Sequence, residues 1–329
     1  MSQRKALCIG IDDYSVKPLS GCVNDAKAWE ELFSENYSVQ TLHNEEATRE
    51  GIVSALQDLI SGSSRGQILV VTYSGHGTQI DHGRDSSEDD GLDEALCPID
   101  FNTTGDLLVD DDIGDLINDL PDGVNLTFLL DCCNSGTMTR EIRPMLRSKV
   151  QGAKFNERFI KLDKELAERI GKNVRRRRKN RKTADRSLRD AMREVLISAA
   201  LPDETAKESG GSGLFTQAAI EFLRNASGPV THREFTRAIR EPVVQAIEEL
   251  GATSQTPSLY CDPQDRDRIL FSRKGSAGPG SVAGGSTSVG SSAGTSITNI
   301  FRGVESQAPS DALATFLESM AALIRSRGH

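Results

Sequence analysis

The stretch Ile68-Leu69-Val70-Val71-Thr72-Tyr73, followed by Ser74-Gly75-His76-Gly77, decides the fold of this 329-residue chain. Its first six residues form a nearly unbroken apolar run, which is typical of a strand covered on both faces of a sheet. Two further runs, Leu7 to Ile11 and Leu126 to Leu130, have the same pattern. Together the three runs predict a central, largely parallel sheet.

Helical patterns alternate with the predicted strands and indicate a layered α/β fold. Apolar residues at helical spacing occur in residues 24–33 and 48–60, and Thr48 can cap the second helix. After a basic segment, the predicted elements are a strand at 195–199, helices at 215–223 and 231–250, and strands at 258–261 and 268–271. This second block has too few apolar residues for a core of its own, so we expect it to complete the same sheet.

The composition is typical of a globular, cytoplasmic protein. With 37% apolar residues, the chain can bury a substantial core. Its six cysteines are scattered and form no CxxC pair, which favours reduced thiols over disulfides or a structural zinc site. No apolar run approaches the roughly 18 residues of a membrane span, and no secretory cleavage site follows the first residues. We therefore expect no membrane partner.

Charge is strongly segregated along the chain, although the net charge is only −9. Residues 140–190 contain 19 Lys and Arg against 7 Asp and Glu, whereas residues 81–122 contain 15 Asp and Glu. A basic insert therefore separates the two blocks of the predicted sheet. The acidic run before it is a solvated surface, a partner of the basic insert or a cation site.

A histidine and a cysteine follow two of the predicted strands. Since parallel strands end at the same edge of a sheet, His76 and Cys133 can meet there as base and nucleophile. Residues two apart share a face of a strand, so Asp131 lies beside Cys133 and Cys132 points away. A carboxylate raises the pKa of a neighbouring thiol, and we therefore expect Asp131 to face a cation. The first hypothesis is a cysteine hydrolase.

Seven ordered motifs between Lys5 and Phe271 resemble the caspase-like clan of cysteine peptidases, and most closely its metacaspase branch. They are Gly21-Cys22-Val23-Asn24-Asp25, Tyr73-Ser74-Gly75-His76-Gly77, the run Asp90 to Asp100, Val109-Asp110-Asp111-Asp112-Ile113, Asp131-Cys132-Cys133-Asn134-Ser135-Gly136, the run Ile197 to Ala206, and Gln255-Thr256-Pro257. The chain resembles a type I-like metacaspase without an N-terminal prodomain. The resemblance implies a caspase-like three-layer sandwich with a mostly parallel central sheet.

The resemblance also implies an endopeptidase that cuts after arginine or lysine. In it, Cys133 is the nucleophile, His76 is the general acid and base, and N–H groups near Gly77 and Cys133 stabilise the oxyanion. The specificity pocket would comprise Cys22, Asp25, Ser74 and Asp131. Two carboxylates suit a guanidinium, which presents its N–H donors in one plane. Alternatively, Asp25 is only a first-turn acid of the predicted helix.

A calcium site is a further implication of the resemblance. Asp93, Asp110 and Asp111 match three aspartates of the family's site, and carboxylate oxygens are the ligands that calcium prefers. A fourth aspartate is expected seven residues after the nucleophile, where this chain has Arg140. A basic residue at that position repels a cation, so the expectation of Ca²⁺ depends on three carboxylates.

The basic insert has three interpretations. An enzyme that cuts after arginine or lysine would process itself there, and we favour this interpretation. The run Arg175 to Lys182 could instead bind nucleic acid phosphates, but it lacks interleaved aromatic residues and a recognition motif. The third interpretation is a solvated helix face at residues 154–169.

The expected organisation is one catalytic fold with appendages. Its parts are a large-subunit-like segment at 1–139, the basic linker at 140–192, a small-subunit-like segment at 193–274, a flexible Gly/Ser-rich linker at 275–296 and an amphipathic helix at 297–329. We expect this tail helix to bind its own domain or a partner. The alternative to an enzyme is a non-catalytic caspase-like adaptor whose tail helix and basic insert bind partners.

Overall fold

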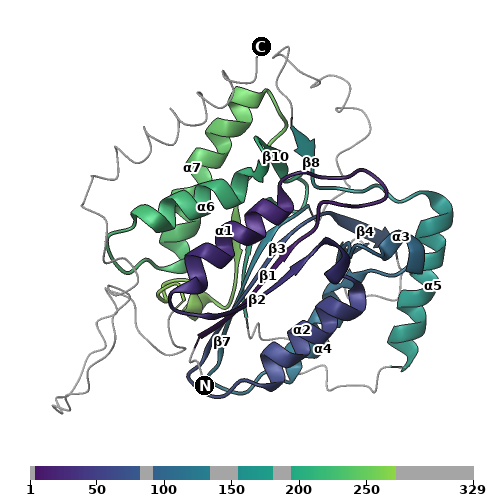
Figure 1. The fold of residues 1–329 in the computed structure, drawn as a ribbon, viewed down its shortest axis with the longest axis horizontal. Helices are drawn as coiled ribbons and strands as arrows, with labels where there is room; N and C mark the ends of the chain where they lie inside the picture. The colour runs from purple at the N-terminus through teal and green to yellow at the C-terminus, as the bar shows by residue number, and fades with distance from the viewer. Residues whose placement is uncertain (1–3, 82–91, 134–154, 181–193, 272–329) are drawn as a thin grey trace.

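A computed structural model describes residues 4–81, 92–133, 155–180 and 194–271 (Figure 1). At its centre is a six-stranded sheet in the order β12-β9-β7-β3-β1-β2. The strands are β1 (Arg4–Gly10), β2 (Ser38–His43), β3 (Ile68–Ser74), β7 (Asn125–Asp131), β9 (Val195–Ser198) and β12 (Ser258–Tyr260). Within this sheet the edge pair β12 with β9 is antiparallel and the other neighbours are parallel. The predicted mostly parallel α/β sheet is therefore confirmed.

Helices cover both faces of the sheet (Figure 1). One face packs against α1 (Cys22–Ser34), α6 (Leu214–Asn225) and α7 (His232–Leu250), and the other against α2 (Arg49–Ser61) and α4 (Asp110–Asn118). Helix α5 (Lys164–Asn180) lies further out, beside the strand that follows His76. Alternate residues of β1 enter opposite cores, Ala6 and Cys8 on the α1 side and Leu7 and Ile9 on the α2 side. Coverage on both faces explains the unbroken apolar runs. The three-layer sandwich is confirmed.

Two small sheets adjoin the central sheet. The first contains β4 (Gly77–Asp81), β5 (Leu92–Leu96) and β6 (Leu108–Val109), and the short helix α3 (Phe101–Thr104) lies between β5 and β6 in the chain. The second contains β8 (Asn156–Glu157), β10 (Lys207–Ser209) and β11 (Ser212–Gly213). Since β4 begins one residue after His76, the first small sheet starts at the end of β3.

Side-chain caps fix the starts of two predicted helices. The hydroxyl of Thr48 accepts a hydrogen bond from the N–H of Gly51 at 3.0 Å at the start of α2. Thr231 and Glu234 form a reciprocal capping box at the start of α7. Each cap satisfies N–H groups that have no partner within the helix. The predicted starts at 48 and 231 are these N-cap residues.

Two sequence-based expectations are wrong. The segment 268–271 is not a strand, because only Ile269 forms an isolated bridge, to Thr231. Arg268 instead pairs with Asp265 at 3.0 Å and donates to Asn125 at 2.7 Å, so buried polar contacts hold this segment. The predicted helix face at 154–169 is also wrong in its extent. Residues 156–157 form β8, and the helix begins only at Lys164.

Several expected features lie outside the described residues. They include Arg140, the whole of the Gly/Ser-rich linker at 275–296 and of the tail at 297–329, and the last part of the basic run after residue 180. None of the helices in the described ranges has the length and hydropathy of a membrane span.

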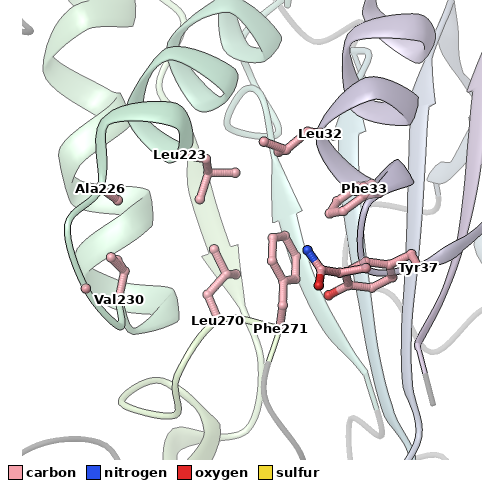
Figure 2. A pocket seen from close by; sticks show the side chains of 10 residues that line it. Leu32, Phe33, Tyr37, Leu223, Ala226, Val230, Leu270 and Phe271 are labelled. Carbon is pink, nitrogen blue, oxygen red and sulfur yellow. The ribbon is translucent and has the colours of Figure 1, made fainter. Parts of the chain in front are cut away.

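An apolar pocket lies between the C-terminal part of α1 and the end of α6 (Figure 2). Leu32 and Phe33 line it from α1, Leu223 from α6, and Leu270 and Phe271 from the end of the described chain. Cys22 begins the same helix at its opposite end. The apolar pocket is therefore separate from the candidate site.

Candidate active site

The strand register brings His76 and Cys133 to the same edge of the sheet. Strands β3 and β7 pair in parallel from Ile68 with Asn125 to Ser74 with Asp131, a constant offset of 57 residues. His76 and Cys133 are also 57 residues apart, and each lies two positions beyond the last registered pair. Both are fully buried.

The two adjacent cysteines lie in opposite cores. Cys132 belongs to the cluster on the α2 side, and Cys133 to the cluster on the α1 side. The Sγ atom of Cys133 accepts a hydrogen bond from the N–H of Ala206 at 2.7 Å, and its thiol contacts the carbonyl of Ala206 at 3.3 Å. The alternation argument from the sequence predicts this opposite orientation.

The imidazole of His76 is held through one ring nitrogen. Its Nε2 donates to the backbone carbonyl of Lys17 at 2.7 Å, and the ring of Tyr14 lies 4.7 Å away between centroids. Lys17 has a left-handed backbone, with φ of 54°. A proton on Nε2 leaves Nδ1 as the basic nitrogen, and Nδ1 is buried without a hydrogen-bond partner among the described residues.

His76 and Cys133 are both neutral at pH 7 while they are buried as in this structure. Burial lowers the pKa of His76 to about 4, although backbone groups of Lys17 and Arg158 act in the opposite direction. Burial raises the pKa of Cys133 to about 12, and the charge of Lys207 opposes this increase. Desolvation disfavours the charged form of each group. The pair therefore starts as imidazole and thiol, with the proton on sulfur.

The chain's own Arg158 places its carbonyl group between the two strand ends. The Arg158 oxygen accepts hydrogen bonds from the N–H of Gly77 at 3.0 Å and from the N–H of Cys133 at 3.3 Å. These are the two N–H groups expected to stabilise an oxyanion. The N–H of Arg158 in turn donates to the carbonyl of Ala206 at 2.9 Å. The same Ala206 contacts the sulfur of Cys133, so the Arg158 carbonyl lies at the nucleophile.

The guanidinium of Arg158 fills a buried pocket of carboxylates. It forms ion pairs with Asp25 at 2.6 Å, Asp131 at 3.0 Å and Glu208 at 3.4 Å. All four side chains are at most 2% exposed. The fully buried Cys22 closes the pocket, with Sγ 3.8 Å from Glu208. Several carboxylate acceptors thus converge on the planar donors of the guanidinium.

Of the residues that the sequence assigned to the specificity pocket, the structure gathers Cys22, Asp25 and Asp131 around Arg158. Ser74 lies opposite Asp131 in the strand register, next to the pocket. Asp25 lies in the first turn of α1, yet its carboxylate points into the pocket and accepts from the N–H of Gly213 at 3.1 Å. Burial raises the pKa of Asp25 to about 6, with Arg158 acting against the increase.

A short strand pairing carries Arg158 into the pocket. β8 pairs antiparallel with β10, with Glu157 opposite Lys207 and Asn156 opposite Glu208 (Figure 1). The amide of Asn156 also donates to Glu208 at 2.9 Å. The segment before Arg158 is thus bound as an added strand, a common way to bind an extended peptide.

The aspartates expected at a calcium site fall on two neighbouring segments. Asp110 and Asp111 begin α4, and Asp93 lies in β5, which pairs with β6 through Ala95 and Val109. Strand β6 ends at Val109, so the chain turns into α4 directly after its pair with Ala95. Three hard oxygen donors suit calcium. The same acids also lie where a helix N-terminus favours negative charge.

Another cluster, Asp12, Cys22 and Glu208, has the side-chain types of a metal site. Its carboxylates already have partners, because Asp12 accepts from the N–H groups of Cys22 and Val23 at 2.8 and 3.1 Å. Glu208 pairs with Arg158. Asp12 therefore caps α1, and Glu208 belongs to the guanidinium pocket.

Three functional residues were missed from the sequence, namely Lys17, Arg158 and Glu208. Arg158 did leave a signal, because the two aromatic residues of the insert, Phe155 and Phe159, lie on either side of it. An aromatic pair around one basic residue indicates a segment that docks on the fold. Glu208 lies on a three-residue strand and Lys17 in a loop, where periodicity gives no signal.

A solved structure has the same arrangement of elements. The crystal structure of a protein from Geobacter sulfurreducens aligns with a TM-score of 0.60 and 22% identity, covering 82% of this chain and 98% of that one. At this identity the likeness concerns the fold. A mostly parallel six-stranded sheet with a histidine and a cysteine at one edge defines the caspase-like class of proteins.

Residues 4–141 match the metacaspase, peptidase C14 domain. This part of the chain, 138 of its 329 residues, is similar to the metacaspase family, and the matches do not separate the type I and type II branches of that family. Metacaspase-1 of Cryptococcus neoformans is 37% identical over 147 residues, which is 41% of this chain and 32% of that protein. Metacaspase-4 of Arabidopsis thaliana is 33% identical over 154 residues, 44% of this chain and 36% of that protein. The chain thus spans about a third of the length of these relatives.

Proposed function

We propose that this chain is a cysteine endopeptidase that cleaves after arginine or lysine and processes itself between Arg158 and Phe159. One observation carries the proposal, the position of Arg158. Its side chain occupies the carboxylate pocket while its carbonyl oxygen accepts from Gly77 and Cys133. A bound substrate would need both contacts, and the chain supplies them with its own residue.

The reaction follows from the neutral pair. His76 takes the proton of the Cys133 thiol through Nδ1, and the sulfur attacks the carbonyl carbon of Arg158. The carbonyl oxygen becomes an oxyanion held by the N–H groups of Gly77 and Cys133. The C–N bond to Phe159 then breaks, and the imidazolium gives its proton to the departing nitrogen. Water, deprotonated by His76, hydrolyses the thioester and releases the carboxylate and the thiol.

The pocket supports arginine over lysine as the preferred residue before the cut. Arg158 uses Nη1 for Asp131 and Nη2 for Asp25 and Glu208. A lysine ammonium has one nitrogen for the same three acids and cannot form the two-nitrogen contact. We therefore expect arginine peptides to be cut faster than lysine peptides. Peptides with aspartate before the cut would place like charges together and would resist cleavage.

Mass spectrometry of the purified full chain tests the proposal. The active chain should give fragments that end at Arg158 and begin at Phe159, and it should release the fluorophore from an arginine aminocoumarin peptide. Cys133→Ala should abolish both reactions. Cys132→Ala is the matched control, because this thiol lies in the opposite core, and it should retain both. A Cys133→Ala chain that is still cut at Arg158 would overturn the assignment.

Calcium belongs to the proposal as an activating ion. Asp93, Asp110 and Asp111 would hold it through carboxylate oxygens, and the ion would supply positive charge that offsets their mutual repulsion. Chelator should lower arginine-peptide hydrolysis, and added calcium should restore it. Asp111→Ala should lose the restoration. Activity that is equal with and without chelator would remove calcium from the proposal.

A further inference from the structure

The residues that follow Arg158 are held by groups that the proposed cleavage chemistry does not use. The side chain of Lys17 donates from Nζ to the carbonyl of Phe159 at 2.7 Å. The N–H of Ile160 donates to the carbonyl of Gly77 at 3.1 Å, and the hydroxyl of Thr78 donates to the carbonyl of Ile160 at 2.7 Å. Both residues after the bond are therefore fixed through their backbone groups.

Gly77 contacts the peptide on both sides of the bond to be cut. Its N–H donates to the Arg158 oxygen before the bond, and its carbonyl accepts from Ile160 after it. The side chains of Phe159 and Ile160 are buried, at 7% and 4% exposure. Phe159 joins the same core cluster as Cys133 and Ala206, and Ile160 joins the opposite one. The surroundings on this side of the bond are apolar.

We infer that Lys17, Gly77 and Thr78 form a binding site for the first two residues after the cut in peptide substrates. The inference rests on the proposed function and extends it to the departing side of the bond. The three contacts are to backbone atoms, so they do not themselves depend on the side chains of the substrate. The buried setting selects substrates with an aromatic or aliphatic residue at each of the two positions.

Lys17 has two tasks in this site. Its backbone carbonyl accepts from Nε2 of His76, while its Nζ holds the carbonyl of the departing segment. A peptide that engages Nζ therefore fixes the loop that orients the imidazole. A hydrogen bond from a charged donor changes binding by about ten- to a hundredfold. The ammonium is thus a positioning group for the departing peptide.

Two fluorogenic substrates with the same residues before the cut, Phe-Asn-Glu-Arg, test the inference in the full-length chain. One ends in aminocoumarin and has no peptide carbonyl after the bond. The other continues with Phe-Ile and carries a donor and quencher. Lys17→Met keeps the backbone carbonyl and the aliphatic stem but removes the ammonium. It should lower the ratio of kcat/KM for the extended over the aminocoumarin substrate by about tenfold or more.

Thr78→Val, which removes a hydroxyl at nearly constant volume, should lower the same ratio. The matched control is Lys27→Met, on the exposed surface of α1, which should leave the ratio at the wild-type value. The inference would be overturned if Lys17→Met lowered kcat/KM equally for both substrates and Thr78→Val left the ratio of the two kcat/KM values unchanged. That result would leave the proposed function intact. A wild-type chain that cleaves neither substrate would overturn the proposed function itself.

Discussion

Replacing Arg158 by glutamine in the uncut chain should destabilise it strongly. The change is made in a Cys133→Ala background, so that self-processing does not complicate the measurement. Arg158 is the cation shared by Asp25, Asp131 and Glu208, all within 3.4 Å and all buried. Glutamine keeps much of the length and removes the charge, which leaves three buried carboxylates without their partner.

The expected size follows from burial. Removing one partner of a buried ion pair costs about 3–5 kcal/mol, and one kcal/mol shifts Tm by about 2–4 °C in a domain of this size. We therefore expect Arg158→Gln to lower Tm by about 6–20 °C. Arg176→Gln, the same change on an exposed position of α5, should shift Tm by less than about 2 °C.

Thermal unfolding at pH 7 and pH 5 measures the effect. Burial raises the pKa of Asp25, and without Arg158 the charge that opposes this increase is absent. The folded-state pKa then lies above the unfolded one, so stability is lost as pH rises and is regained at low pH. The deficit should therefore shrink at pH 5, and adding Asp25→Asn should recover part of it at pH 7. If Arg158→Gln melts within about 2 °C of its parent, the carboxylates do not depend on Arg158 and the reasoning fails.

Three further predictions concern the catalytic pair. In Gly77→Ala a Cβ would overlap the carbonyl of Cys133, so arginine-peptide hydrolysis should fall at least about a hundredfold; Gly114→Ala, which meets no neighbouring atom, should keep wild-type rates. In the uncut His76→Gln chain, iodoacetamide should alkylate Cys133 at least about a hundredfold more slowly than an exposed thiol, because the Cys133 thiol is buried. Mass spectrometry measures the alkylated fraction, and rapid alkylation would contradict this burial. The folded pKa of His76, about 4, lies below its ordinary value near 6.5, so stability falls as pH falls through this window. Denaturant titrations at several pH values give the slope of the unfolding free energy against pH. In a Cys133→Ala background, adding His76→Gln should reduce this slope by up to about 1.4 kcal/mol per pH unit, and equal slopes would contradict the prediction.

The central sheet could be predicted from the sequence because strands buried on both faces are apolar at most positions instead of at alternate ones. The registered runs at 68–74 and 125–131 show this, and their common edge brings His76 and Cys133 together. The predicted strand at 268–271 failed because its apolar pair, Leu270 and Phe271, lines a pocket beside α1 instead of pairing with β12.

The occupant of the guanidinium pocket could not be predicted. Arg158 is one of 19 basic residues in the insert, and the two-residue strand β8 is too short for any periodicity. Its position depends on carboxylates from α1, β7 and β10, which come together only after folding. The charge composition therefore predicted only the segment in which the proposed cut lies, the basic insert, and not the residue.

The pairing of β8 with β10 makes the chain its own tethered ligand. Only 21 residues separate Cys133 from Phe155, and a short linker gives a local concentration on the order of millimolar. A competing peptide at micromolar concentration cannot displace such a segment to a measurable extent. The first cut should therefore be a unimolecular event whose rate does not change on dilution, and hydrolysis of added peptides should begin only after a lag set by that event.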